Sequence, residues 1–291
     1  MMRRVSAGFT LIEMVVAIVI GSIVIGFVAM FMTAPVEAYF AQSRRTDLIQ
    51  DQSEATRQLR EDLRHALPNS VRIRVSGTRA IVEMLRVEND VFYNADAEAG
   101  SVDERELKVG SADQKFAVFP QFTTAPGAWY AVVGNTGTGT TSAYRFSAAA
   151  TSGVIAALAN SSMQDAANRE TQLQLSSAFR FPATGSAARR LFLVSGPVTY
   201  ICNSAGNVAA LRRYSGYPIS QNIPTSESSA QLASATSDLV VDNVASCSVR
   251  CWAGTAPCQG ALIVDMSVRR TAASGNEAVR VFAQIPLDNR S

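Results

Sequence analysis

The feature that most constrains this chain is an uncharged apolar run from Met14 to Met32, close to the amino terminus. About 20 consecutive apolar residues in a helix span the hydrocarbon core of a bilayer, so the run predicts a transmembrane helix. One carboxylate, on Glu13, stands directly before the run. A charged side chain at membrane depth costs at least about 2.5 kcal/mol, so Glu13 predicts a functional contact. We expect its partner to be an amine.

The charges on either side of the run predict its orientation. Arg3 and Arg4 precede it, whereas the next basic residues, Arg44 and Arg45, come well after it. Basic residues stay on the cytoplasmic side of a membrane helix. We therefore expect a single pass, with the amino terminus in the cytoplasm and the bulk of the chain exported.

The residues at the start of the run resemble a known processing site. The stretch from Gly8 to Glu13 reads Gly-Phe-Thr-Leu-Ile-Glu behind a short basic leader, and it resembles the amino terminus of the type IV prepilins. The resemblance implies that a prepilin peptidase cuts between Gly8 and Phe9, and that Phe9 is then N-methylated. It also implies that Glu13 is the assembly carboxylate, which recognises the terminal amine of a neighbouring subunit. The expected location is the bacterial inner membrane, followed by a pilus or pseudopilus filament.

Two plainer explanations of the run are a secretory signal and a simple anchor. A secretory signal needs a small-x-small cut site after its apolar part, but the segment from 31 to 37 contains no Ala-x-Ala site. An uncleaved anchor fits the length of the run but gives no reason for Glu13 at that depth. Both explanations are therefore weaker than the prepilin resemblance.

The helix is expected to continue past the membrane. Pro35 removes a backbone donor and clashes with the preceding turn, so it predicts a helix kink just beyond the bilayer. The next segment has apolar or small side chains at spacings of three and four, which is typical of an amphipathic helix docked on a core. These residues are Ile49, Gln52, Thr56, Leu59, Leu63 and Ala66. The predicted organisation is a leader at 1–8, a long helix at 9–67 with its transmembrane half at 9–34, and a periplasmic β-rich head at 68–291.

Later segments carry a narrower resemblance. The stretches 45–49, 60–73, 197–202 and 242–247 resemble the group of PilW-type and MshO-type minor pilins and J-type pseudopilins, and most resemble the MshO type of mannose-sensitive haemagglutinin (MSHA) pili. The resemblance implies a minor pilin that helps to assemble or initiate an MSHA-like pilus. Its implied partners are prepilin peptidase, other minor and major pilins, and the inner-membrane assembly platform. The alternatives are a J-type pseudopilin of a type II secretion system, or a pilin-anchored adhesive module that binds through the loops at 123–162.

The head is expected to be β-rich. After Pro68 the hydrophobic period changes from 3.6 to about 2, and Val71–Val75 and Ala80–Val87 predict a hairpin. An antiparallel sheet packed on one long helix, an α+β pilin-like fold, is the simplest architecture. The Ala/Ser/Thr/Gly-rich stretches predict surface loops, and Gly134–Thr141 lacks the Lys of a phosphate-binding loop and predicts a flexible tip. Further strands are expected at 116–119, 179–181, 191–194, 198–202, 208–214, 238–241, 261–269 and 279–285, and loops at 123–142, 148–162 and 225–237.

The four cysteines predict disulfides. In an exported domain an even number of cysteines indicates disulfide bonds rather than catalytic thiols. Cys251 and Cys258 can close a short hairpin loop, which leaves Cys202 to pair with Cys247 between strands. Zinc is the alternative, but the spacing of these cysteines differs from that of the usual zinc sites.

The composition gives little support for an enzyme. A catalytic triad needs a histidine, and the only one, His65, stands on the amphipathic helix. The carboxylates of Glu98, Asp103, Glu104 and Glu106 share one polar loop that has no apolar pocket. With 26 basic and 24 acidic residues the formal net charge is +2, so no nucleic acid is expected as a partner. We expect no cofactor and no metal.

Overall fold

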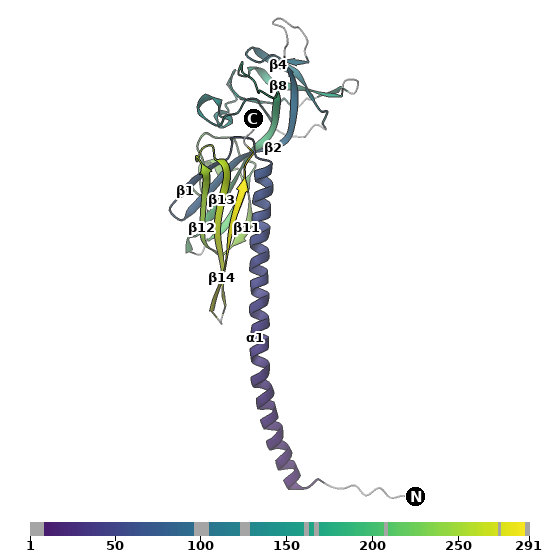
Figure 1. The fold of residues 1–291 in the computed structure, drawn as a ribbon, viewed down its shortest axis with the longest axis vertical. Helices are drawn as coiled ribbons and strands as arrows, with labels where there is room; N and C mark the ends of the chain where they lie inside the picture. The colour runs from purple at the N-terminus through teal and green to yellow at the C-terminus, as the bar shows by residue number, and fades with distance from the viewer. Residues whose placement is uncertain are drawn as a thin grey trace, which may run out of the picture. The chain divides into compact units, whose positions relative to one another are not determined.

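The computed structural model describes residues 9–95, 105–122, 129–159, 163–165, 169–206, 209–272 and 275–288. The chain forms two compact units, Met1–Ile49 and Gln50–Ser291. The fold class is α+β, with an apolar amino-terminal helix followed by a mostly antiparallel β-sheet head (Figure 1). This confirms the predicted fold class.

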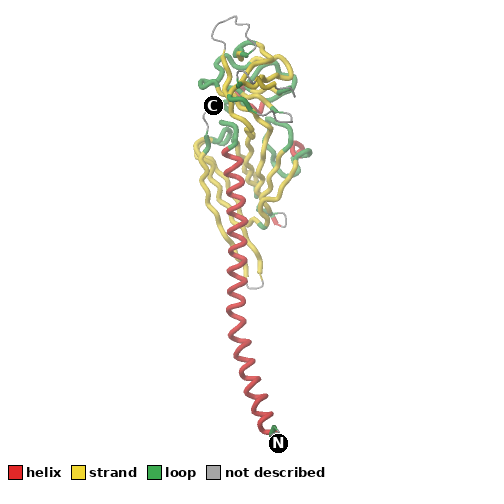
Figure 2. Tube along the Cα trace, turned by 90° about the vertical axis from the view of Figure 1, so that its right-hand side faces the viewer, coloured by secondary structure: helices red, strands yellow, loops and turns green. Residues whose placement is uncertain are grey.

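One long helix, α1 (Leu11–Arg64), begins in the first unit and ends in the second. Figure 2 draws α1 as one continuous helix. Its stretch Leu11–Met32 is long and apolar enough to cross a membrane, and none of it is buried. The helix continues through Pro35 without interruption, so the kink at this residue stays a prediction.

The end of α1 comes slightly before the predicted position at residue 67. The N–H of His65 already bonds the carbonyls of both Glu61 and Asp62, which tightens the last turn. The N–H of Leu67 then bonds the carbonyl of Leu85 at 2.7 Å, so the chain joins the sheet before it reaches its proline. The helix ends where a sheet partner becomes available for its backbone.

The larger of two sheets has eleven strands and forms most of the head. Its strands pair antiparallel, except that β2 and β3 pair in parallel. Its main path runs in the order β11 (Thr236–Asp242), β10 (Ala210–Ser215), β9 (Arg190–Asn203), β2 (Arg79–Ala95), β4 (Ala112–Phe119), β8 (Glu170–Arg180) and β7 (Met163–Asp165). Attached to this path are β1 (Arg72–Ser76), β3 (Glu106–Leu107), β5 (Tyr130–Val132) and β6 (Ile155–Ala157).

The smaller sheet is an antiparallel meander of three strands. It consists of β12 (Val244–Ala253), β13 (Gln259–Ala272) and β14 (Gly275–Pro286), in that order. On β13, Leu262, Met266 and Val268 are buried, as the alternation of a strand with one covered face requires. The antiparallel head is therefore divided between two sheets, where the sequence predicted one sheet and no strand at β12.

The C-terminal turns of α1 pack on the head through one stripe. Ala55, Leu59 and Leu63 are at most 5% exposed, and they recur at the spacing of a docked helix face. Gln52 is fully buried and donates a hydrogen bond to the carbonyl of Val279 on β14 at 2.7 Å. Of the predicted stripe, Gln52, Leu59 and Leu63 are buried and Thr56 is half-buried. Ile49 is 56% exposed and Ala66 lies beyond the end of α1, so neither belongs to it.

Two of the predicted surface loops, 123–142 and 148–162, contribute to the core instead. The second contains β6, where Ile155 and Ala156 are buried. The stretch 123–142 contains β5, and Ala131, Val132 and Val133 are fully buried. Asn135, in the segment expected to be a flexible tip, is 2% exposed and donates to the carbonyl of Pro68 at 2.7 Å. The low hydropathy of this stretch predicts a surface loop. In the structure its small side chains pack against the segment that directly follows α1.

Candidate functional site

The amino-terminal turn of α1 holds the residues predicted to act in assembly. Thr10 directly precedes the helix and forms a reciprocal pair with Glu13. The backbone N–H and the hydroxyl of Thr10 donate to Glu13 Oε2 at 3.2 Å and 3.1 Å, and the N–H of Glu13 lies 3.4 Å from Thr10 Oγ1. This is a capping box, in which the two residues satisfy backbone donors that the helix start leaves free.

The capping box gives Glu13 a structural role that the sequence analysis missed. The pattern Thr-x-x-Glu before an apolar run is the signal that identifies it. A carboxylate at a helix amino terminus also interacts favourably with the helix dipole. Glu13 therefore stabilises the first turn of α1 within a single subunit. Its carboxylate is exposed, so it can still accept a hydrogen bond from a second subunit.

The remaining predicted residues of this site are placed only in part. Phe9 is 83% exposed and directly precedes Thr10, whereas Gly8 lies outside the described residues. Cleavage between Gly8 and Phe9, methylation of Phe9 and recognition through Glu13 stay predictions.

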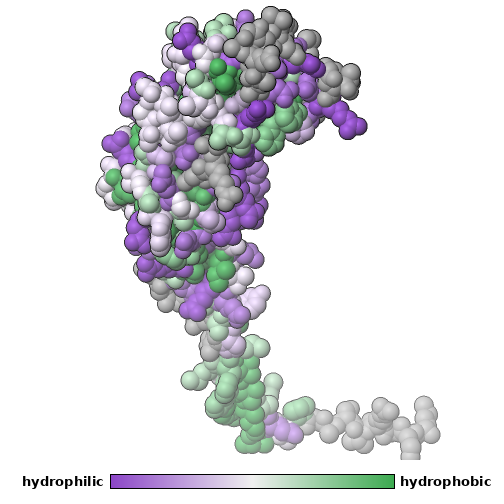
Figure 3. Space-filling view, turned by 45° about the horizontal axis from the view of Figure 1, so that its top comes forward, coloured by the Kyte–Doolittle hydropathy of each residue, from purple (hydrophilic) through white to green (hydrophobic). Residues whose placement is uncertain are grey.

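The helix that follows has exposed apolar side chains at nearly every position from Leu11 to Met32. Figure 3 shows this apolar surface from one side. Leu11, Ile12 and Ile25 are 84%, 70% and 70% exposed, and their neighbours are similar. A helix that is apolar on every face is stable only when lipid or other protein surrounds it. The stretch therefore fits a membrane anchor.

Residues 3–29 match a known family, described as the Prokaryotic N-terminal methylation motif. The segment is a methylation motif. It supports a type IV pilin-like protein, a class whose members in general interact with other pilins and are processed by prepilin peptidase. No curated protein and no solved structure matches the chain.

The cysteines of the head form two disulfides. Cys202 on β9 bonds Cys247 on β12, with Cα atoms 6.3 Å apart, and so links the two sheets. Cys251 bonds Cys258, with Cα atoms 5.4 Å apart, and closes the loop between β12 and β13. Within the described residues there is no group of three or more potential metal ligands.

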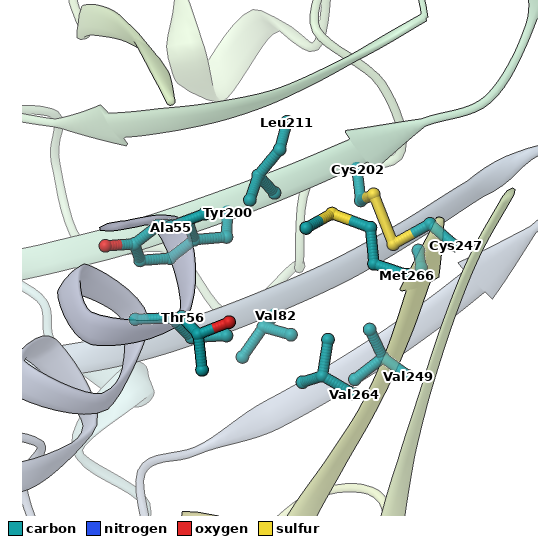
Figure 4. A pocket seen from close by; sticks show the side chains of 12 residues that line it. Ala55, Thr56, Val82, Tyr200, Cys202, Leu211, Cys247, Val249, Val264 and Met266 are labelled. Carbon is teal, nitrogen blue, oxygen red and sulfur yellow. A yellow bond between two sulfur atoms is a disulfide. The ribbon is translucent and has the colours of Figure 1, made fainter. Parts of the chain in front are cut away.

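The disulfide between the sheets borders a small apolar cavity of about 30 Å³ (Figure 4). Ala55 and Thr56 of α1 line one side of it, and Met266 of β13 lies beside the sulfur atoms. Because a cavity of this size holds only one or two water molecules, it is a packing defect and not a ligand site.

A buried carboxylate joins the end of α1 to the larger sheet. Asp62 Oδ2 accepts from Tyr200 Oη at 2.6 Å and from Arg213 Nε at 2.7 Å, while Oδ1 accepts from Arg86 at 3.0 Å. Burial and the hydrogen bond to Asp62 both raise the pKa of the Tyr200 hydroxyl, so this group stays protonated as a donor. The cluster fixes the helix to β2, β9 and β10.

A second buried ion pair lies beside the exit of the helix. Arg72 on β1 donates to Glu83 on β2 at 2.5 Å, and Tyr217 Oη donates to the other oxygen of Glu83 at 2.8 Å. The guanidinium of Arg72 also stacks 3.5 Å above the ring centroid of Tyr144. Burial raises the pKa of the Glu83 carboxyl against the opposing influence of Arg72. The guanidinium of Arg72, the carboxylate of Glu83 and the hydroxyl of Tyr217 satisfy one another, which indicates a structural role.

The other candidates for chemistry are dispersed. His65 is exposed, and its Nδ1 lies 3.0 Å from the carbonyl of Glu61 one turn earlier. Of the acidic loop, Glu106 begins β3, whereas Glu98, Asp103 and Glu104 lie outside the described residues. The described residues do not bring these groups together.

Proposed function

We propose that this chain is a minor pilin or pseudopilin that takes part in the assembly of a type IV filament. One observation carries the proposal: a methylation motif at residues 3–29 overlaps a helix stretch whose apolar surface is exposed on every side. Cleavage after Gly8 would make Phe9 the terminus, four residues before Glu13. The subunit would wait in the inner membrane, with its amino terminus cytoplasmic and its head periplasmic, until it enters the filament.

The capping box suggests how the Glu13 carboxylate can act both in the free subunit and in the filament. In the free subunit, Thr10 supplies two donors to Glu13 Oε2. In the filament, the positively charged amine of a neighbour's Phe9 would be a third and stronger partner, because charge-assisted hydrogen bonds are roughly twice as strong as neutral ones. Glu13 therefore sets the register between subunits without being needed for insertion.

Within this class, we favour a role in assembly or initiation of an MSHA-like pilus. The support is the resemblance of the helix exit and of scattered strands to MshO-type proteins. A J-type pseudopilin of a type II secretion system shares the same anchor and helix break. The interaction partners in either system are prepilin peptidase, other pilins and the inner-membrane assembly platform.

The proposal is tested by looking for the chain in filaments sheared from the cell surface. We expect tryptic peptides of the head, such as 80–86, in the filament fraction of the wild type. They should be missing from it in a strain without prepilin peptidase, while the unprocessed protein remains in the membrane fraction. Equal recovery from both strains, or from neither, contradicts a role as a processed filament subunit.

A further inference from the structure

A cleft of about 560 Å³ opens on the head at the β11 end of the larger sheet. This volume lies within the roughly 300–1,000 Å³ of small-ligand sites. The cleft lies over the strands β2, β9, β10 and β11, and the turn that carries Glu227 and Ser228 walls it on one side. Neither the proposed filament role nor the methylation motif involves this part of the molecule.

Strand register builds the floor of the cleft. Arg79, Asn203, Ala210 and Asp242 are direct neighbours across four adjacent strands. Directly opposed residues in a sheet project from the same face, so these four side chains form one row. The small methyl group of Ala210, between Asn203 and Asp242, leaves the space that becomes the cleft.

A β-bulge in β11 brings an apolar side chain to the same face. Ala210 pairs with Asp242 and Arg212 pairs with Leu239, so β11 has one more residue than β10 between these two pairs. Residues three apart on a regular strand project to opposite faces, but the extra residue of a bulge restores Leu239 to the face of Asp242. Leu239 is 55% exposed and lines the cleft. The bulge therefore places an apolar contact beside Arg212 and Asp242.

Two of the charged residues in the lining are used by the wall itself. Glu227 Oε2 accepts from Arg79 Nε at 2.8 Å, and Oε1 accepts from Asn203 Nδ2 at 2.7 Å. Burial would raise the pKa of Glu227, but hydrogen bonds from its own backbone, Arg79 and Asn203 outweigh burial and lower it. Arg79 and Glu227 thus neutralise each other and hold the wall in place before any ligand arrives.

The other two charged residues of the lining, Arg212 and Asp242, are left out of this network. Within the described residues, neither side chain forms a hydrogen bond or an ion pair. They are diagonal neighbours on adjacent strands, and residues so related lie about 7–8 Å apart. The cleft therefore presents one positive and one negative group to a ligand, close together and both available.

A zwitterion matches this pair of charges better than a simple ion does. An ion of either sign is attracted by one of the two groups and repelled by the other. A carboxylate accepts two parallel hydrogen bonds from the guanidinium of Arg212, and an ammonium group donates to the carboxylate of Asp242. In an α-amino acid both charged groups are attached to one carbon, which suits partners that are close together. Its side chain would then meet the exposed surface of Leu239.

We propose that this cleft binds a free α-amino acid with an apolar side chain. Arg212 holds the carboxylate of the ligand, Asp242 holds its ammonium group, and Leu239 packs on its side chain. The inference concerns the head alone and does not depend on the proposed role in a filament.

Calorimetric titration of the full chain in detergent tests the proposal, with L-leucine, L-methionine and L-phenylalanine as probes. We expect at least one of them to bind. For L-leucine, two analogues remove one charge each: 4-methylpentanoate lacks the amine, and isopentylamine lacks the carboxylate. Each analogue should bind about tenfold or more weakly than L-leucine, because hydrogen bonds to charged groups are the stronger kind.

Variants of the two available charges test their roles. Arg212→Ala and Asp242→Asn should each weaken binding of the amino acid about tenfold or more, because each removes one charge-assisted contact. Arg250→Ala changes an exposed arginine of the smaller sheet, so it is the matched control and should leave binding unchanged. Thermal unfolding of each variant checks its fold, and Arg212→Gln replaces Arg212→Ala if the latter unfolds.

Three results overturn the proposal. The first is no binding of any of the three amino acids, and the second is equal affinity in the cleft variants and the control. The third is tighter binding of a singly charged analogue, or of glycylleucine, than of L-leucine. Glycylleucine has its two charges farther apart, so a preference for it would contradict a site built for both charges on one carbon.

Discussion

Two carboxylates of α1 show how the surroundings of a residue decide its role. Glu13 is exposed at the first turn, and among the residues that the structure describes its carboxylate bonds only Thr10 at the helix start. Asp62 is 5% exposed near the last turn, and its partners lie on three different strands. The first carboxylate is available to a neighbouring subunit, whereas the second is fully used inside the head.

Variants of Glu13 separate capping from assembly. Glu13→Gln keeps the capping box, since Gln serves at this position, but it removes the charge that would attract a neighbour's amine. We expect Glu13→Gln and Glu13→Ala to lower filament number equally while the amount of processed protein in the membrane stays normal. The measurements are filament counts and quantification of mature protein in the same strains.

Thr10→Ala is the matched control for these variants. It removes the cap at a cost of about 0.5–2 kcal/mol but keeps the Glu13 carboxylate, so filaments should persist. Normal filaments with Glu13→Gln would show that the charge is not the assembly contact.

Removal of the Asp62 carboxylate should destabilise the head strongly. Asp62→Ala leaves Arg213 and the hydroxyl of Tyr200 without their buried partner, and loss of one partner of a buried pair costs about 3–5 kcal/mol. Urea unfolding of the full chain in detergent, followed by tryptophan fluorescence, measures the change. Glu54→Ala, which removes only the exposed contact of Glu54 with Arg57, should leave the midpoint unchanged. Equal midpoints for Asp62→Ala and the wild type would contradict the structural role of the cluster.

At the scale of helices and strands, the sequence predicts those elements whose apolar residues recur with a regular period. The docked stripe of α1 from Gln52 onward and the hairpin of β1 and β2 follow from local patterns of spacing. By contrast, β12 has mostly small and polar residues and escaped recognition. The sequence predicts two strands, 191–194 and 198–202, on either side of Pro197. The structure has one continuous strand, β9, in which Pro197 lies opposite Leu85.

The buried clusters could not have been found by pattern. Arg213 lies 151 residues from Asp62 along the chain, and Tyr217 lies 134 residues from Glu83. No local rule connects such partners, because the sheet topology alone brings them together. The capping box of Thr10 and Glu13, with a separation of three residues, was by contrast within reach of a motif search.

The two disulfides should stabilise the head by different amounts. The entropy of loop closure grows with loop length, which gives about 4 kcal/mol for the sequence separation of 45 residues between Cys202 and Cys247. The separation of 7 between Cys251 and Cys258 gives about 2.4 kcal/mol. We expect the double serine variant of the longer bridge to unfold at the lower urea concentration.

Peptide mapping without reduction checks the pairing that this comparison assumes. It should recover Cys202 joined to Cys247 and Cys251 joined to Cys258. The opposite order of stability, with the pairing intact, would show that strain or residual structure outweighs loop entropy.

At the scale of the whole molecule, the two units meet different physical demands. The first carries an apolar helix stretch that needs lipid or other subunits around it. The second has its own core, two disulfides and two buried ion clusters. These properties suit the proposed subunit, which is stored in a membrane and later packed into a filament. In this proposal, packing into the filament depends on the terminus that cleavage would create.

Mass spectrometry of the mature protein tests that central claim most directly. The protein is purified from a strain with active prepilin peptidase, and its amino-terminal peptide is sequenced. The proposed processing predicts a chain that begins at Phe9 and carries one methyl group on its α-amine. A chain that begins at Met1, or at any residue beyond Met32, would contradict it.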